Sequence, residues 1–177
     1  MNLKKILIIT FIVTIFIYGP KRVNADESIG NFSANVGFVS EYNFRGIDQS
    51  NDMTAIQGGF DWLHASGIYV GTWASNVDFN DNYSVTEFDY YGGFATELDG
   101  GINIDLSMIL CTYPGAYDSS NYDYYEYAFG LENSVGPLSL STAINYSPEF
   151  FGKSGDATYL QGGADYSLPI GITLSGH

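Results

Sequence analysis

Basic residues are scarce in this 177-residue sequence, and they are unevenly placed. Four of the six lysines and arginines, at positions 4, 5, 21 and 22, precede residue 26, whereas all twenty acidic residues follow position 25. Only Arg45 and Lys153 remain beyond that point, so residues 26–177 carry a formal charge of −18. So little positive charge disfavours nucleic acid and anionic lipid headgroups as partners, and it favours cationic solutes.

Cysteine, histidine and charged residues are also few. Cys111 is the only cysteine, which excludes a disulfide within the chain, and charged residues make up 15% of the sequence against about 25% in ordinary globular proteins. Enzymes of the hydrolytic kind usually need a histidine or paired carboxylates at the rim of a cleft. The two histidines are His64, which falls beside a short predicted turn, and His177. The sequence therefore predicts no enzyme, no cofactor and no metal site.

The first 25 residues have the pattern of an export signal. Lys4 and Lys5 precede the mainly apolar run 6–19, and residues 23–25 supply the small side chains that signal peptidase prefers. The apolar run has fourteen residues, fewer than the roughly 18–20 that a helix needs to cross a bilayer. We therefore expect residues 1–25 to be a cleaved signal peptide and residues 26–177 to form the mature domain.

The mature region consists of alternating segments, each bounded by residues typical of turns. Eight complete segments and the start of a ninth near the C-terminus are predicted as strands, so the expected fold class is all-β. They run near 31–45, 54–64, 67–77, 86–98, 101–113, 123–134, 137–147 and 157–168. Their length suits tilted strands that cross a hydrocarbon layer.

Each segment has two unlike faces, and residues 86–98 show this most clearly. At a period of two, Phe88, Phe94 and Leu98 share one face, whereas Glu87, Asp89 and Glu97 share the other. In a soluble sandwich the apolar face would turn inward to a core. In an outer-membrane barrel it would turn outward to lipid and leave the acids inside. Segment 67–77 is ambiguous, because large residues occupy both of its faces.

The connections between segments alternate in length. GIDQSNDM, DFNDNYSV, PGAYDSSNY and PEFFGKSGD are long, whereas HASG, LDGG, SVGP and LPIG are short. Short turns at one end and long loops at the other are typical of an antiparallel up-and-down transmembrane β-barrel. A Greek-key sandwich would interrupt this alternation with a crossover. We expect a barrel with at least eight strands here and ten to twelve in the complete protein, since the sequence stops within a strand-like segment.

The same alternation divides the polar and aromatic residues. The residues predicted to face the lumen are Glu41, Asn43, Arg45, Gln57, Asp61, Glu87, Asp89, Glu97, Asn103 and Asp105. A wide, water-filled lumen lined in this way would favour cations, whereas in a narrow barrel the same groups would form a plug with Arg45 at its centre. The aromatic residues placed for the membrane interface are Phe32, Phe44, Trp62, Tyr113, Tyr124, Tyr146, Tyr159 and Tyr166.

Four stretches of the mature region are informative when taken in order: NVGFVSEYNFRGIDQS, AIQGGFDW, SGIYVGTWASNVDF and EFDYYGGFA. Together they resemble the TorF family of porins of bacterial outer membranes, and the most specific part runs from Asn35 to Phe79. The resemblance implies an outer-membrane β-barrel. Family members continue past the point where this sequence stops, and their last strand commonly carries the signal for barrel assembly.

The sequence thus predicts a Gram-negative outer-membrane porin through which small hydrophilic solutes, cations preferentially, diffuse passively. Its expected partners are outer-membrane lipid, periplasmic chaperones and the barrel-assembly machinery, and the oligomeric state stays open. Two alternatives also stay open. One is a non-conducting structural or adhesive barrel whose external loops bind partners, and the other is a soluble periplasmic sandwich.

Overall fold

The computed structural model describes residues 30–81 and 83–177. The predicted signal peptide, residues 1–25, lies outside the described residues. Within them no helix is long and apolar enough to span a membrane.

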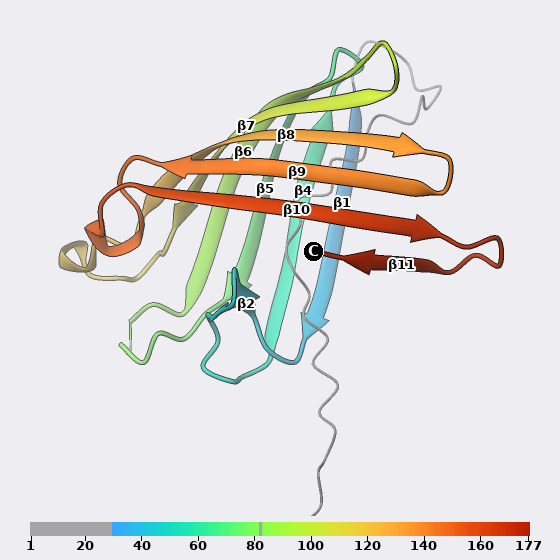
Figure 1. Cartoon of the computed structure of the whole chain (residues 1–177). Helices are drawn as coiled ribbons and strands as arrows, with labels where there is room; N and C mark the ends of the chain where they lie inside the picture. The colour runs from blue at the N-terminus through green and yellow to red at the C-terminus, as the bar shows by residue number, and fades with distance from the viewer. Residues whose placement is uncertain (1–29, 82) are drawn as a thin grey trace, which may run out of the picture.

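The described residues form β-strands and two short 3-10 helices (Figure 1). Nine strands make one sheet: β1 (Asn31–Val39), β4 (Ala55–Leu63), β5 (Ile68–Asn76), β6 (Thr86–Leu98), β7 (Ile102–Thr112), β8 (Tyr124–Val135), β9 (Leu138–Ser147), β10 (Ala157–Ser167) and β11 (Thr173–Gly176). The strands β2 (Asn43–Phe44) and β3 (Ile47–Asp48) form a separate hairpin, and the 3-10 helices are η1 (Asp118–Ser120) and η2 (Phe151–Lys153).

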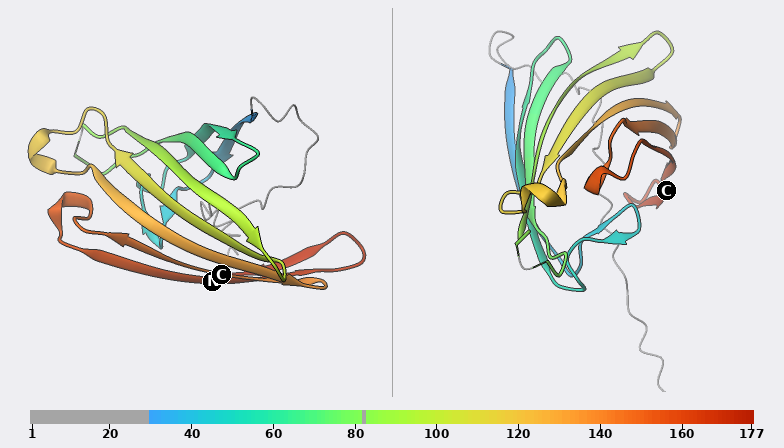
Figure 2. Two further views of the ribbon diagram at one scale, coloured as in Figure 1. Left: turned by 90° about the horizontal axis from the view of Figure 1, so that it is seen from above. Right: turned by 90° about the vertical axis from the view of Figure 1, so that its left-hand side faces the viewer.

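The sheet is an antiparallel meander in which every strand pairs with its neighbours in chain order. This confirms the prediction of an all-β, antiparallel fold without a Greek-key crossover. Within the described residues β1 pairs only with β4 and β11 only with β10, so these two strands are the edges of the sheet. Figure 2 shows that the sheet curls strongly and that its two edges lie on opposite sides of the opening.

The predicted continuous strand over residues 31–45 is wrong, because β1 ends at Val39 and the chain then folds back. Arg45 and Gly46 both have positive φ, 50° and 80°, which gives the tight turn between β2 and β3. Ser50 Oγ accepts a hydrogen bond from the Tyr42 amide at 2.9 Å. This hydrogen bond and the positive φ angles end the strand, and a period-two pattern of side chains does not reveal either of them.

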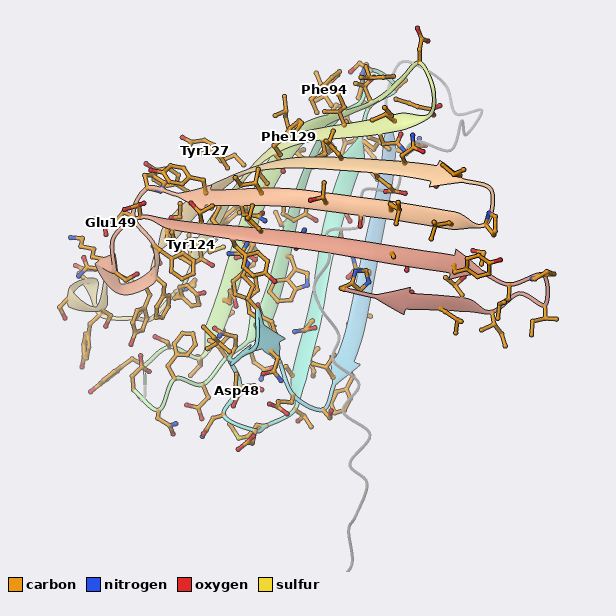
Figure 3. The ribbon with its side chains drawn as sticks, in the orientation of Figure 1. Asp48, Phe94, Tyr124, Tyr127, Phe129 and Glu149 are labelled. Carbon is orange, nitrogen blue, oxygen red and sulfur yellow. The ribbon has the colours of Figure 1, made fainter. Side chains whose placement is uncertain are left out.

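The two faces of the sheet differ as strongly as the sequence predicts. Large apolar side chains cover the convex outer face, including Phe60 at 71% exposed and Leu106 at 54%. Figure 3 shows Phe94, Tyr127 and Phe129 projecting from this face, whereas Tyr124 lies on the concave side. The ambiguous strand, β5, exposes Ile68 and Val70 outward.

All four long connections lie at one end of the meander, and all four short turns lie at the other, because each strand reverses direction. The long connections include the β2–β3 hairpin, η1 and η2. They contact one another through backbone hydrogen bonds, from Asp78 N to Gln49 O and from Gly152 N to Asn121 O, each 2.9 Å. The long-loop end is therefore a packed cap over the concave face.

Candidate functional site

The concave face carries acidic residues of the strands β4, β6, β7 and β8. Asp61 on β4 and Asp105 on β7 lie under tyrosines: the Tyr91 hydroxyl donates to Asp61, and the Tyr69 hydroxyl donates to Asp105 Oδ2 at 2.7 Å. Neither tyrosine was among the predicted site residues. Alternation puts Tyr91 on the face of Glu87 and Asp89, whereas Tyr69 lies in the segment 67–77, whose faces the sequence left ambiguous. Asp61 and Asp105 therefore both have neutral donors as partners.

The other predicted lumen residues do not form one site. Gln57 is buried on β4, and Asn103 is half-buried on β7. Glu97 is exposed near the short turn that follows β6. Glu41 accepts a hydrogen bond from Asn43 Nδ2 at 2.8 Å, so these two residues pair with each other in the segment before the β2–β3 turn.

Arg45 reaches across the concave side to the far half of the sheet. Its Nη1 and Nη2 donate to Glu126 Oε2 and Oε1 on β8, at 2.7 and 2.8 Å. The guanidinium also lies over the rings of Phe44 and Tyr159, 4.6 and 4.3 Å from their centroids. Glu126 was not among the predicted residues, although on β8 it alternates with the large side chains Tyr125 and Tyr127, which places it on the opposite face from them.

Glu87, Asp89 and Cys111 form a second, fully enclosed group on the concave side. Glu87 and Asp89 are two residues apart on β6, and Asp89 lies directly opposite Cys111 on β7. One oxygen of each acid and the Cys111 sulfur lie within 4.8 Å of one another. The three side chains are only 3–7% exposed.

Tyrosine hydroxyls surround this acid–thiol group. Tyr42 and Tyr113 lie next to Glu87, and Tyr124 lies next to Cys111. The break in the strand after Val39 turns Tyr42 inward, where its ring packs against Trp73. Burial and the Glu87 carboxylate raise the pKa of the Tyr42 and Tyr113 phenols, so both stay neutral donors.

An aromatic cap closes the long-loop end above these groups. We define it as Phe79, Tyr113, Tyr122, Tyr124, Phe150 and Phe151. These residues come from the β5–β6, β7–β8 and β9–β10 connections and from the start of β8. Phe151 and Tyr122 stack with centroids 4.3 Å apart, and Phe79 packs edge-on against Phe151 at 5.4 Å. Tyr113 and Tyr124 are about 95% buried in it, so their predicted positions at the membrane interface are wrong.

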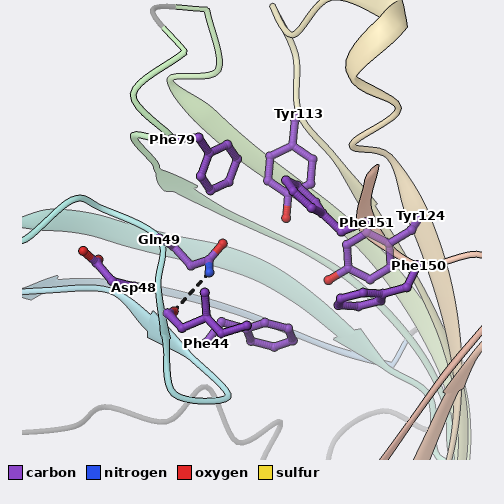
Figure 4. Close-up of a pocket in the computed structure, with 9 residues that line it drawn as sticks. Phe44, Asp48, Gln49, Phe79, Tyr113, Tyr124, Phe150 and Phe151 are labelled. Carbon is purple, nitrogen blue, oxygen red and sulfur yellow. Dashed lines mark hydrogen bonds between the residues drawn. The ribbon is translucent and has the colours of Figure 1, made fainter. Parts of the chain in front are cut away.

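A cavity of about 140 Å³ lies between the aromatic cap and the β2–β3 hairpin. Figure 4 shows Phe79, Tyr113, Phe151 and Tyr124 along one side of it, across from Gln49 and Phe44. Tyr113 and Tyr124 therefore separate the cavity from the acid–thiol group. The arrangement therefore consists of a mainly apolar cavity at the long-loop end and, behind the two phenols, the buried acidic residues Glu87 and Asp89.

The chain belongs to a family of bacterial proteins described as being of unknown function, Gcw_chp, whose pattern matches residues 24–177. The match covers the whole of the described sheet. No curated protein matches the chain.

Proposed function

We propose that this protein is an outer-membrane β-barrel of the porin type, exported through a cleaved N-terminal signal, that lets small hydrophilic solutes and preferentially cations diffuse passively. The observation that carries the proposal is the separation of two faces on a single sheet. One face is apolar and exposed, and the other is acidic and buried.

The apolar face supports a lipid environment. Soluble monomers rarely expose apolar patches larger than a few hundred Å². Here the convex face carries exposed apolar side chains on each of the nine strands of the large sheet, and among the described residues no second sheet covers them. Contact with lipid hydrocarbon is favourable for such an apolar face, whereas contact with water is unfavourable. The soluble sandwich would require a covering layer.

Closure into a barrel is part of the proposal. In hydrocarbon an unpaired backbone N–H or C=O costs several kcal/mol, so both edges of the sheet would need partners. The curl of the sheet and the even division of long and short connections between its two ends suit an up-and-down barrel. The resemblance of Asn35 to Phe79 to the TorF family of porins supports the same reading.

The charge of the interior supports the preference for cations. Five carboxylates of the concave face are Asp61, Glu87, Asp89, Asp105 and Glu126, whereas Arg45 is the one basic side chain that the described residues place there. An anionic wall raises the local concentration of cations and repels anions. Because Glu126 neutralises Arg45, the remaining acids set the sign of the interior.

Planar-bilayer recording tests the proposal. The purified protein, folded in detergent and added to a bilayer, should produce discrete conductance steps, and a salt gradient should give a reversal potential of cationic sign. The double variant Asp61→Asn/Asp105→Asn should shift that potential toward zero, because it removes two interior charges while its amides still accept from Tyr91 and Tyr69. The matched control is Asp99→Asn, which removes an exposed charge at a short turn. Preference for anions would contradict the proposal.

A non-conducting structural or adhesive barrel is the second candidate, and the aromatic cap favours it. Phe79, Tyr122 and Phe151 pack across the long-loop end, and Arg45 forms an ion pair with Glu126 on β8. If the cap stays closed, no steps appear in the wild-type recording. Steps that appear only after Phe151→Ala would then identify a plugged barrel.

A further inference from the structure

We propose that Glu87, Asp89 and Cys111 form a binding site for one divalent transition-metal ion, with Zn²⁺ as the ion that best fits the donors. The site lies on the concave side at the long-loop end of β6 and β7, behind Tyr113 and Tyr124. The sequence alone predicts no metal site here, because Cys111 is the single cysteine and its position opposite Asp89 depends on the register of the folded sheet.

Glu87 and Asp89 have no basic side chain as a partner among the described residues. Glu87 is 3% exposed and Asp89 is 7% exposed, and they project from the same face two residues apart. The basic residues among positions 30–81 and 83–177 are Arg45, which is bound to Glu126, and Lys153, which is exposed. Burying two carboxylates without a cation lowers the stability of the folded protein, and one divalent ion would neutralise both charges.

Both acids also have an oxygen inside the site that accepts no hydrogen bond from the described residues. Glu87 Oε2 and Asp89 Oδ1 are buried and receive no hydrogen bond from the described residues. The remaining buried acid of this region, Glu126, differs because Arg45 occupies both of its oxygens. Unpaired acceptors next to a thiol are what a metal ion would satisfy.

The donor set selects the kind of ion. A thiolate with two carboxylates suits Zn²⁺, whereas Ca²⁺ and Mg²⁺ prefer oxygen ligands alone. Ligand atoms around tetrahedral Zn²⁺ lie about 3.5 Å apart, so the atoms now within 4.8 Å need a small side-chain adjustment. The Tyr42 hydroxyl beside Glu87, or a water molecule, would complete the coordination. Binding releases the thiol proton of Cys111 to solvent.

A second acidic group, Glu41, Asp48 and Asp52, does not make the same case. Asp48 Oδ1 accepts from the Ser50 amide and Oδ2 accepts from the Asp52 amide, each at 2.8 Å. The Asp48 carboxylate is therefore already used to stabilise the loop that follows β3. This group serves as an internal comparison for the metal experiment.

Zinc titration of the detergent-folded protein against a chromophoric chelator tests the site. We expect one Zn²⁺ per chain, and an affinity at least about 100-fold lower in Glu87→Gln and in Cys111→Ser, which is more than the loss of an outer-shell partner produces. Glu97→Gln is the matched control, because Glu97 lies on the same face of β6 but is exposed. Glu41→Gln, in the other acidic group, should also leave the affinity unchanged.

A spectroscopic arm separates coordination from loss of folding. Cd²⁺ bound to the wild type should give a thiolate charge-transfer band in the ultraviolet, and Cys111→Ser should lack the band while retaining the far-ultraviolet circular dichroism of the sheet. Glu87→Gln removes a buried charge, so it should not unfold the chain. The proposal is overturned if the wild type binds no Zn²⁺, if Cys111→Ser binds it unchanged, or if Ca²⁺ binds as tightly as Zn²⁺. None of these readouts depends on channel activity.

Discussion

Arg45 and Glu126, 81 positions apart in the sequence, form a two-pronged ion pair across the concave side of the sheet, with N–O distances of 2.7 and 2.8 Å. Their side chains are 17% and 4% exposed. The pair ties the β2–β3 turn to β8, so it fixes the inward fold of residues 40–54. The sequence predicts Arg45 among interior acids, and the structure identifies Glu126 as the acid that it binds.

Removal of Arg45 should destabilise the protein. Arg45→Met leaves Glu126 buried without its counter-charge, and breaking such a pair costs about 3 kcal/mol. We expect the free energy of unfolding in detergent, measured by urea titration, to fall by about that amount. The control is Arg45→Met/Glu126→Leu, which removes both charges and should recover most of the loss. If the double variant is no more stable than the single one, unpaired charge is not the cause.

The outer face should be accessible to lipid. Leu106 and Ser107 are neighbours on β7 that point to opposite faces, and Leu106 is 54% exposed. In a Cys111→Ser background, nitroxide labels at Leu106→Cys and Ser107→Cys can be compared in lipid bilayers. The label at position 106 should respond to dissolved oxygen and the label at 107 to a water-soluble nickel complex. The reverse pattern would contradict a lipid-facing convex surface.

Gly59 should not tolerate a side chain. A Cβ at this position would lie 2.2 Å from the backbone oxygen of Thr72 on the paired strand β5, which cannot move aside without disturbing the ladder. Gly59→Ala should lower the free energy of unfolding by about 1–3 kcal/mol. Gly37→Ala is the matched control, since the nearest atom to its Cβ is 4.0 Å away. Equal unfolding midpoints would refute the steric argument.

The Asp81 loop should loosen in acid. Backbone amides of Ser84 and Tyr83 donate to the Asp81 carboxylate, and these bonds hold the pKa of Asp81 below its ordinary value. A lowered folded-state pKa means that the contribution to stability is complete above the unfolded-state pKa and is lost as pH falls through the folded-state value. Nuclear magnetic resonance titration of the Asp81 carboxyl carbon checks the direction. Asp81→Asn should abolish the pH dependence of the Ser84 amide shift.

Phe151 should hold the loop between β9 and β10 against the rest of the cap. It stacks on Tyr122 and packs edge-on against Phe79 and Tyr113. Aromatic pairs of this kind contribute about 0.5–1.5 kcal/mol each, so Phe151→Ala should speed tryptic cleavage after the nearby Lys153 about tenfold or more. Phe60→Ala, on the outer face, should leave the cleavage rate unchanged. An unchanged rate in both variants would show that the cap does not restrain this loop.

Much of the architecture follows from local sequence. Alternation on segments such as 86–98 assigns Phe88 and Glu87 to opposite faces, because successive side chains of a strand always point to opposite sides. Alternating long and short connections likewise predict an antiparallel meander with its loops at one end. The same reasoning failed after Val39, where the hydrogen bond from Tyr42 to Ser50 and the positive φ at Arg45 break the period.

The sequence by itself therefore determined the strands, their order and the acidic character of one face, since these depend on periodicity and turn chemistry within short stretches. Only the tertiary structure decided which residues meet. Register across separate strands places Cys111 opposite Asp89, and the inward fold of residues 40–54 brings Arg45 to Glu126. The physical reason is that contacts between distant segments depend on how the sheet curls and how its loops pack, and neither is encoded in a period of two.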